Sequence, residues 1–465
     1  MMSTRTDTEV DGDQLGTSLK PRHITMISIA GVIGAGLFVG SANAIKLAGP
    51  AVLISYTLAG LMVILVMRML GEMATAQPDT GSFSTYAERA LGRWAGSTIG
   101  WLYWLFWVLV IPVEATAAAV ILSKVVGGPQ WSWALVVVVL LTATNLFSVG
   151  NYGEFEFWFA LIKVVAIAAF LVLGALAIFG VLPGSSVSGV SHLWDTGGFM
   201  PNGVKAVLAA MLTTMFTFMG SEIVTIAAAE SPNPEKGITK AVNSVVWRIC
   251  LFYLGSIFVV VALVPWNSVD GATGSYQAVL KAMNIPAAAG IMDVVVLVAV
   301  ASCLNSALYT ASRMLYSLAR RGDAPRAAGR TTARGVPAVA VLASMALGFL
   351  AVIGNYVLPD KLFGYLLATT GAVALFVYLV IAISQIALRR RATEPAPIRM
   401  WLFPWLTYAV IAFIVFVIVA MILDPDQRSS VGLSTALAAI VLVASIVHQK
   451  RVEKRGAKRG DSSRV

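Results

Sequence analysis

Long apolar runs separated by short polar connections dominate the hydrophobic pattern of the chain. A helix needs about 20 mostly apolar residues to cross the hydrocarbon core of a bilayer. Measured against that length, the pattern predicts an all-α polytopic membrane protein with twelve transmembrane helices. These helices are expected near residues 24–45, 50–72, 97–123, 131–150, 156–180, 204–229, 242–265, 287–319, 337–357, 361–388, 402–423 and 430–448.

The first apolar run is interrupted at its centre. Gly31, Gly34 and Gly36 fall in the middle of residues 24–45, with Ile33 and Ala35 between them. Glycine weakens a helix and lets another group approach the backbone closely. An interrupted helix survives inside a membrane only where its backbone lines a protected cavity. Residues 31–36 are therefore the first candidate for a binding site.

The sixth apolar run has a similar interruption, because the centre of residues 204–229 holds Gly220, Glu222 and several hydroxyl side chains. Corresponding interruptions in two halves of a chain are typical of a transporter built from inverted repeats. Residues 24–180 and 204–388 are thus predicted to form a 5+5 inverted repeat with helices 1 and 6 interrupted, followed by two C-terminal helices over 402–448. The alternative is that Gly220 only permits close helix packing.

Such an interruption suggests a class of ligand. A half-helix that starts after a break presents unpaired N–H groups and a partial positive charge. A carboxylate can bind there without a basic side chain. Gly34, Ala35 and Gly36 could supply these N–H groups, so small zwitterions are natural ligands for the first interruption.

Composition and charge agree with a membrane protein. The chain is 58% hydrophobic and only 12% charged, whereas soluble domains carry about 25% charged residues. Lysine and arginine are concentrated in residues 1–23, in alternate connections and in the basic segment 449–465. Because such residues favour the cytoplasmic side, both termini are expected in the cytoplasm and the protein in the cell inner (plasma) membrane. The basic tail is interpreted as a topology anchor beside anionic lipid, with no role in binding nucleic acid.

Several kinds of site are not expected. The three histidines are scattered along the chain, so no metal cluster is predicted, and no cofactor is implied. The two cysteines, Cys250 and Cys303, both lie in apolar runs and do not suggest a disulfide framework. No nucleotide-binding loop, zinc-protease motif or catalytic triad pattern is present, which argues against an enzyme.

Three ionisable residues lie inside predicted spans, where a charge is costly and is a functional hypothesis by default. Glu222 could meet a ligand ammonium or could be a protonated structural group. Lys163 could take up and release a proton in each cycle, or could extend its amine to the nearer interface. Glu114 could pair with another helix or contact substrate. Cys303, beside a polar stripe over residues 302–312, could be a small core residue or could touch the pathway.

Five stretches of the chain have a recognisable pattern: residues 22–34, 78–86, 151–158, 198–203 and 302–316. They resemble the amino acid permeases of the amino acid–polyamine–organocation (APC) superfamily, and especially its bacterial permeases for 4-aminobutyrate (GABA). The likeness covers roughly residues 18–450.

This resemblance implies the fold of the sodium-coupled neurotransmitter transporters (LeuT-like) and proton-coupled uptake by alternating access. It implies that the backbone of Gly34, Ala35 and Gly36 holds the substrate carboxylate. By the same likeness, Phe216 or Phe218 covers the site, Lys163 takes the place of a sodium ion, and Glu222 is an acidic group near the substrate. Many superfamily members carry Ser or Thr where this chain has Ala35, so a hydroxyl contact to the carboxylate is lost here.

The expected function is a proton-coupled secondary active importer of GABA or a related amino acid. The alternatives are a permease or exchanger for another amino acid, such as proline, β-alanine or an aromatic one, and a transport-dead amino acid sensor on the same scaffold. The expected partners are a small amino acid, a proton and the lipid bilayer.

Overall fold

The computed structural model describes residues 33–77, 82–147, 152–223, 225, 234–269, 274–285, 287–332, 335–359, 361–425 and 427–461. Within these ranges all regular structure is helical. Gly31 and the rest of the first predicted span before Ile33 lie outside the described residues.

The first half of the chain forms the following helices: η1 (Gly36–Gly40), α2 (Ser41–Ala48), η2 (Gly49–Ala51), α3 (Val52–Ala76), α4 (Ser82–Leu91), α5 (Arg93–Val126), α6 (Gln130–Phe147), α7 (Tyr152–Ile178), η3 (Ser191–Leu193) and α8 (Gly203–Phe218). The second half forms α10 (Pro234–Arg248), η4 (Ile249–Gly255), α11 (Ser256–Leu263), η5 (Trp266–Ser268), α12 (Ser275–Ala282), α13 (Ala288–Arg320), η6 (Arg326–Gly329), α14 (Ala338–Val357), α15 (Leu362–Arg391), α16 (Trp405–Leu423) and α17 (Arg428–Asp461).

Nine helical stretches of the described chain are long and apolar enough to cross a membrane, and two shorter apolar helices cover Gln130–Leu146 and Gly203–Phe218. Every range predicted from hydropathy overlaps one of these helices. The chain is therefore a multi-pass helical membrane protein. One stretch, Gly36–Ala76, covers the first two predicted spans and includes a turn at Gly49, which adopts a φ of +64° beside Pro50.

Some boundaries differ from the hydrophobic pattern. Helix α17 continues to Asp461, well past the predicted end at residue 448, because its polar part is rich in Lys and Arg and contains no proline. Helix α10 begins at Pro234 and is amphipathic before the apolar run starts. Helices α4 and α12 form in connections that carry too few apolar residues to be read as spans.

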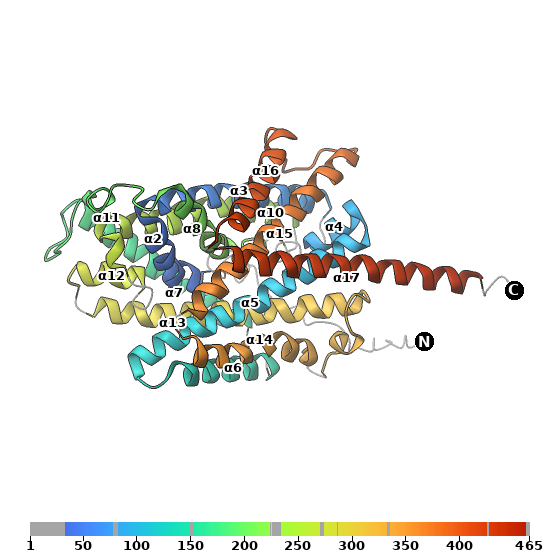
Figure 1. The fold of residues 1–465 in the computed structure, drawn as a ribbon, viewed down its shortest axis with the longest axis horizontal. Coiled ribbons are helices and arrows are strands. Elements are labelled where there is room, and N and C mark those ends of the chain that lie inside the picture. Colours follow the sequence, from blue (N-terminus) through green and yellow to red (C-terminus); the bar gives the residue numbers. More distant parts are fainter. Residues whose placement is uncertain are drawn as a thin grey trace, which may run out of the picture.

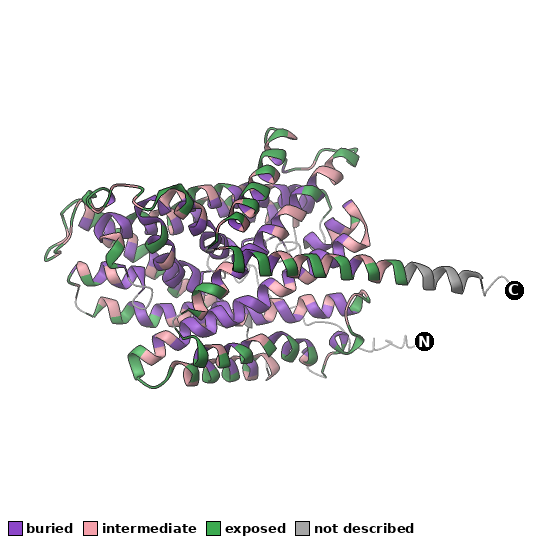
Figure 2. Ribbon diagram, viewed as in Figure 1, coloured by how far each residue is buried: buried purple, intermediate pink, exposed green. Residues whose placement is uncertain are grey.

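Helices α5 and α13 pack along each other near the middle of the molecule (Figure 1). Helix α6 packs against α14 on one side, while α17 lies against α15 and α16. Figure 2 shows that α5 is buried along most of its length, whereas α16 and α17 carry many exposed residues. The exposed side chains of α16 include Val415, Phe416 and Val419. Apolar exposure on an outer helix is what lipid contact requires.

Candidate functional site

The sixth predicted span is interrupted in the structure. Helix α8 ends at Phe218, and Met219 is extended, with φ −64° and ψ 146°. Gly220 follows with a φ of +98°, and a turn covers Ser221 and Glu222. A φ in this region is readily adopted by glycine and strained for other residues. The backbone conformation at position 220 therefore favours glycine over any other residue.

The end of α8, just before this interruption, contacts the start of the helix in the first predicted span. Ile33 and Gly34 are not helical, and Ala35 is the N-terminal cap of η1. A Cβ added to Gly36 would lie 3.0 Å from both the ring of Phe216 and the Cα of Thr217. Glycine at position 36 therefore lets the two helix ends meet closely.

Glu114 of α5 binds the start of η1 directly. The Ala35 N–H donates to both carboxylate oxygens of Glu114, at 3.2 Å to Oε1 and 3.0 Å to Oε2. A negative charge at a helix N-terminus is favoured by the helix dipole and by its unpaired N–H groups. The backbone donor expected to hold a substrate carboxylate is thus occupied by the protein's own carboxylate. Glu114 is 1% exposed.

Gly34 is packed against the same carboxylate and against α13. A Cβ at this position would lie 2.5 Å from Glu114 Oε1 and 2.7 Å from the Cβ of Cys303. Both distances are too short for real contacts. The site therefore accepts only glycine at position 34 without rearrangement.

A small cavity lies beside these groups. It is lined by Gly36, Phe106, Trp107, Val110, Glu114, Phe216, Thr217, Met219 and Cys303. Its volume is about 10 Å³, the space of about one water molecule. Entry of any ligand larger than a water molecule therefore requires side chains around the cavity to move, and Glu114 is the carboxyl group among those that line it.

The other residues predicted for the sixth-span interruption lie apart from the lining of this cavity. The ring of Phe218 packs against Tyr56 and Tyr253, with centroid separations of 5.8 and 4.8 Å. Both oxygens of Glu222 accept the N–H of Gly220, at 3.0 Å each. Glu222 is fully buried and interacts electrostatically with Arg248 of α10.

Lys163 belongs to a buried polar chain that joins α7 to α13. Its Nζ donates to Ser302 Oγ at 2.8 Å, and Ser302 Oγ donates to Glu156 Oε1 at 2.7 Å. Lys163 Nζ and Glu156 Oε1 are 3.9 Å apart, and both side chains are fully buried. Lys163 also interacts electrostatically with Glu114.

Sequence reasoning missed Glu156 as the partner of Lys163. The signal was present, because the two residues are seven apart in the chain, which places them on the same face of a helix two turns apart. Phe106 and Trp107 were also missed as lining residues. They lie in a long apolar run without a polar marker, so nothing distinguishes them from core residues.

The structure thus brings Gly34, Ala35, Gly36, Glu114, Phe216 and Cys303 to one place, with Lys163 nearby. Ile33 is fully buried at the start of the same segment. Among the described residues, no group of three or more His, Cys, Asp or Glu side chains could hold a metal ion. An interrupted helix beside buried ionisable groups is typical of a membrane transporter.

The chain belongs to the amino acid permease family, whose sequence profile matches residues 23–456. It is therefore a transporter rather than an enzyme. The gamma-aminobutyric acid permease of Escherichia coli is 60% identical over 446 residues, covering 95% of this chain and 96% of that protein. The gamma-aminobutyric acid permease of Bacillus subtilis is 51% identical over 94% of both chains.

The solved structure of a manganese transporter mutant from Eremococcus coleocola has a similar fold, with a TM-score of 0.58. The structural match covers 94% of this chain and 97% of the manganese transporter chain, at 12% sequence identity. At this identity the likeness concerns the fold alone. It places the described helices in the architecture of a known membrane transporter.

Proposed function

We propose that the protein imports GABA by alternating access and that uptake is coupled to protons. The proposal of GABA is supported by two relatives named as permeases for this compound, at 60% and 51% identity over nearly the whole chain. A probable GABA permease of Pseudomonas aeruginosa, 59% identical over 448 residues, supports it as well.

The contact between Glu114 and the Ala35 N–H is the observation that carries the mechanism. A substrate carboxylate would bind the same N–H group, which is the first donor of the helix that begins there. Both carboxylates cannot remain charged at one buried donor, because like charges at a shared site disfavour ionisation. Substrate binding would therefore displace Glu114 and favour its protonation.

This competition supplies a route from substrate binding to proton uptake. The charged or titratable groups that face Glu114 are Cys303 of α13 and Lys163 of α7. A proton could rest on Glu114 or within the chain formed by Lys163, Ser302 and Glu156. In either case one proton would accompany one zwitterionic substrate through the membrane.

The proposed fold has twelve membrane crossings, with a five-plus-five inverted repeat over residues 24–180 and 204–388. Four pairs of equivalent spans contact each other: α2 with α8, α3 with α10, α5 with α13, and α6 with α14. Contacts between equivalent helices are expected for repeats related by a two-fold axis in the membrane plane. We further propose that both termini are cytoplasmic and that the protein resides in the inner membrane, because the basic residues favour that orientation.

Uptake of labelled GABA into proteoliposomes tests this function. An inward proton gradient should drive accumulation above the external concentration, and collapse of the gradient by a protonophore should abolish it. Uptake that ignores the proton gradient, or that requires sodium, would reject proton coupling. If unlabelled GABA does not inhibit the uptake of a labelled amino acid that the vesicles do accumulate, GABA is not the substrate.

An aromatic amino acid is the second candidate substrate. It is favoured by an aromatic amino acid transport protein of Corynebacterium glutamicum, which is 42% identical over 440 residues. Competition between labelled GABA and unlabelled phenylalanine in the same vesicles separates the two candidates, since the preferred substrate inhibits uptake at the lower concentration.

A further inference from the structure

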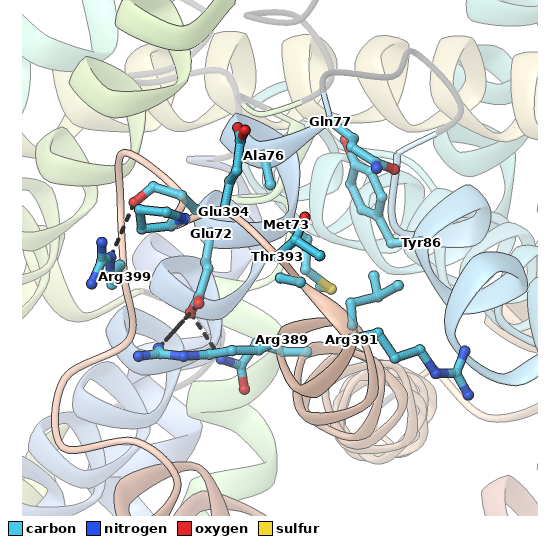
Figure 3. A pocket seen from close by; sticks show the side chains of 15 residues that line it. Glu72, Met73, Ala76, Gln77, Tyr86, Arg389, Arg391, Thr393, Glu394 and Arg399 are labelled. Carbon is cyan, nitrogen blue, oxygen red and sulfur yellow. Dashed lines mark hydrogen bonds and ion pairs between the residues drawn. The ribbon is translucent and has the colours of Figure 1, made fainter.

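A second and much larger cavity lies at the far end of α3 and α15, with a volume of about 360 Å³. The last turn of α15, the segment that follows it and Tyr86 of α4 complete its walls (Figure 3). The lining residues are Glu72, Met73, Ala76, Gln77, Tyr86, Gln385, Leu388, Arg389, Arg391, Ala392, Thr393, Glu394, Pro395, Ala396 and Arg399. The transport mechanism proposed above uses none of them.

Glu72 lines this cavity, and its carboxylate is hydrogen-bonded by the protein itself. Its Oε2 accepts from Gln385 Nε2 at 2.8 Å, from Arg389 Nη1 at 3.1 Å and from the Met400 N–H at 2.9 Å. Its Oε1 pairs with Arg389 Nη1 at 3.0 Å. The positive charge of Arg389 compensates the charge of this buried carboxylate. Glu72 therefore does not favour the binding of a cation in the cavity.

The remaining charges favour an anion. Arg391 and Arg399 are exposed lining residues at opposite edges of the cavity, with Arg389 drawn between them in Figure 3. Each donates one hydrogen bond to a backbone carbonyl, Arg391 to that of Arg89 and Arg399 to that of Ala396. The second carboxylate, Glu394, is at an exposed position. After Arg389 and Glu72 offset each other, the charged lining residues that remain are two arginines and one carboxylate. Arginine binds phosphate with two parallel hydrogen bonds and is the usual residue for such recognition.

The segment that follows the lining residue Arg399 carries side chains that are typical of a membrane–water interface. Trp401, Leu402 and Trp405, which follow the lining residue Arg399, are exposed to 48%, 77% and 77%. The guanidinium of Arg68 lies 4.0 Å from the ring centroid of Trp401, and its Nε donates to the Arg399 carbonyl at 2.7 Å. Exposed tryptophans mark the level of lipid headgroups, so the cavity opens at the depth of phosphate groups.

We propose that this cavity binds a phosphate-bearing headgroup, with an anionic phospholipid as its source. Arg391 and Arg399 would bind the phosphate oxygens. Gln77 and Thr393 would supply hydrogen bonds to a polar headgroup such as glycerol. The acyl chains would leave past Trp401 and Trp405. Basic pockets between transmembrane helices bind anionic lipids in this manner.

Native mass spectrometry of the purified full-length protein tests the site, with phosphatidylglycerol titrated against phosphatidylcholine. The double variant R391Q/R399Q removes two exposed charges from the cavity and should not disturb the core. Loss of each direct arginine–phosphate contact should weaken binding about fivefold, so the variant should bind phosphatidylglycerol about 25-fold more weakly. If the double variant aggregates, each single variant should lose about fivefold.

The matched control is R326Q/R330Q, which removes two exposed arginines from η6 and the residue after it, outside the cavity. It should retain phosphatidylglycerol binding within about twofold, because only diffuse surface charge changes. Equal loss in both double variants, or equal retention of the two lipids by the native chain, would overturn the proposal.

A further titration with inorganic phosphate distinguishes whether the bound phosphate group belongs to a lipid or to a soluble anion. Phosphate at millimolar concentration should neither displace phosphatidylglycerol nor raise the unfolding temperature of the delipidated protein. If phosphate does both and R391Q/R399Q abolishes the effect, the site takes a soluble anion and the assignment to lipid is wrong. These measurements involve no transport, so their outcome is independent of the GABA proposal.

Discussion

Gly34 has space for no side chain, because Glu114 and Cys303 lie where a Cβ would project. Its neighbour Ala35 offers its N–H to the same carboxylate. Two adjacent residues thus fix the position of the one charged group that lines the small cavity. The close approach of another group to this segment was predictable from its glycines, whereas the identity of that group was not.

We expect Gly34→Ala to abolish most GABA uptake while the protein still folds. Overpacking of a tight contact costs about 1–3 kcal/mol, so displacement of Glu114 or Cys303 should reduce initial uptake about tenfold or more. Gly364→Ala is the control, since nothing lies within 4 Å of a Cβ added there. Normal uptake by the Gly34 variant would contradict the close approach.

Glu114→Gln should separate binding from proton coupling. Glutamine keeps an oxygen that accepts the Ala35 N–H but cannot carry a proton at neutral pH. Exchange of labelled for unlabelled GABA across vesicles should persist, while accumulation driven by a pH gradient should disappear. Full accumulation by this variant would assign the proton to another group, with the chain around Lys163 as the next candidate.

At the scale of helices, buried polar contacts join elements that are distant in sequence. Lys163, Ser302 and Glu156 connect α7 to α13, and Ala35 with Glu114 connects η1 to α5. Hydropathy indicates where helices lie because the bilayer imposes a length on each apolar run. It gives no information on which helices touch, since a lipid-facing residue and a residue between helices can be equally apolar.

The pair formed by Lys163 and Glu156 can be tested with a double-mutant cycle. Removing one partner of a buried pair leaves an uncompensated charge and costs about 3–5 kcal/mol. Lys163→Met should therefore lower the thermal unfolding midpoint in detergent more than the double variant Lys163→Met/Glu156→Gln does. Additive effects of the two single substitutions would show that the side chains do not interact.

Element boundaries were less predictable than element existence. The polar end of α17 and the short helices α4 and α12 form where the apolar signal is weak. Their helicity depends on side chains that favour helices and on contacts made after folding. The interruption after α8 was predictable because Gly220 and Glu222 are unusual inside an apolar run.

At the scale of the whole molecule, the distribution of charge predicts which connections face the cytoplasm. The connection between α7 and α8 and the η6 segment are expected on opposite sides of the membrane. Ser188→Cys should react with a membrane-impermeant maleimide in intact cells, whereas Ala327→Cys should react only after permeabilisation. Both positions are exposed.

The parent chain serves as the control for this labelling, because it already contains exposed Cys250 and buried Cys303. Reaction of both engineered cysteines in intact cells, or the reverse order of reaction, would contradict the proposed orientation. The reverse order of reaction would also place the cavity at the end of α3 and α15 on the outer face of the membrane.

The hydrogen bonds from the Ala35 N–H to Glu114 have a consequence for a cell that has no substrate to import. While no substrate is present, Glu114 accepts the Ala35 N–H, so the helix end has a hydrogen-bond partner, and on the proposed mechanism nothing displaces Glu114 toward proton uptake. We therefore expect idle copies to leak little current, so that starvation does not drain the proton-motive force through this protein.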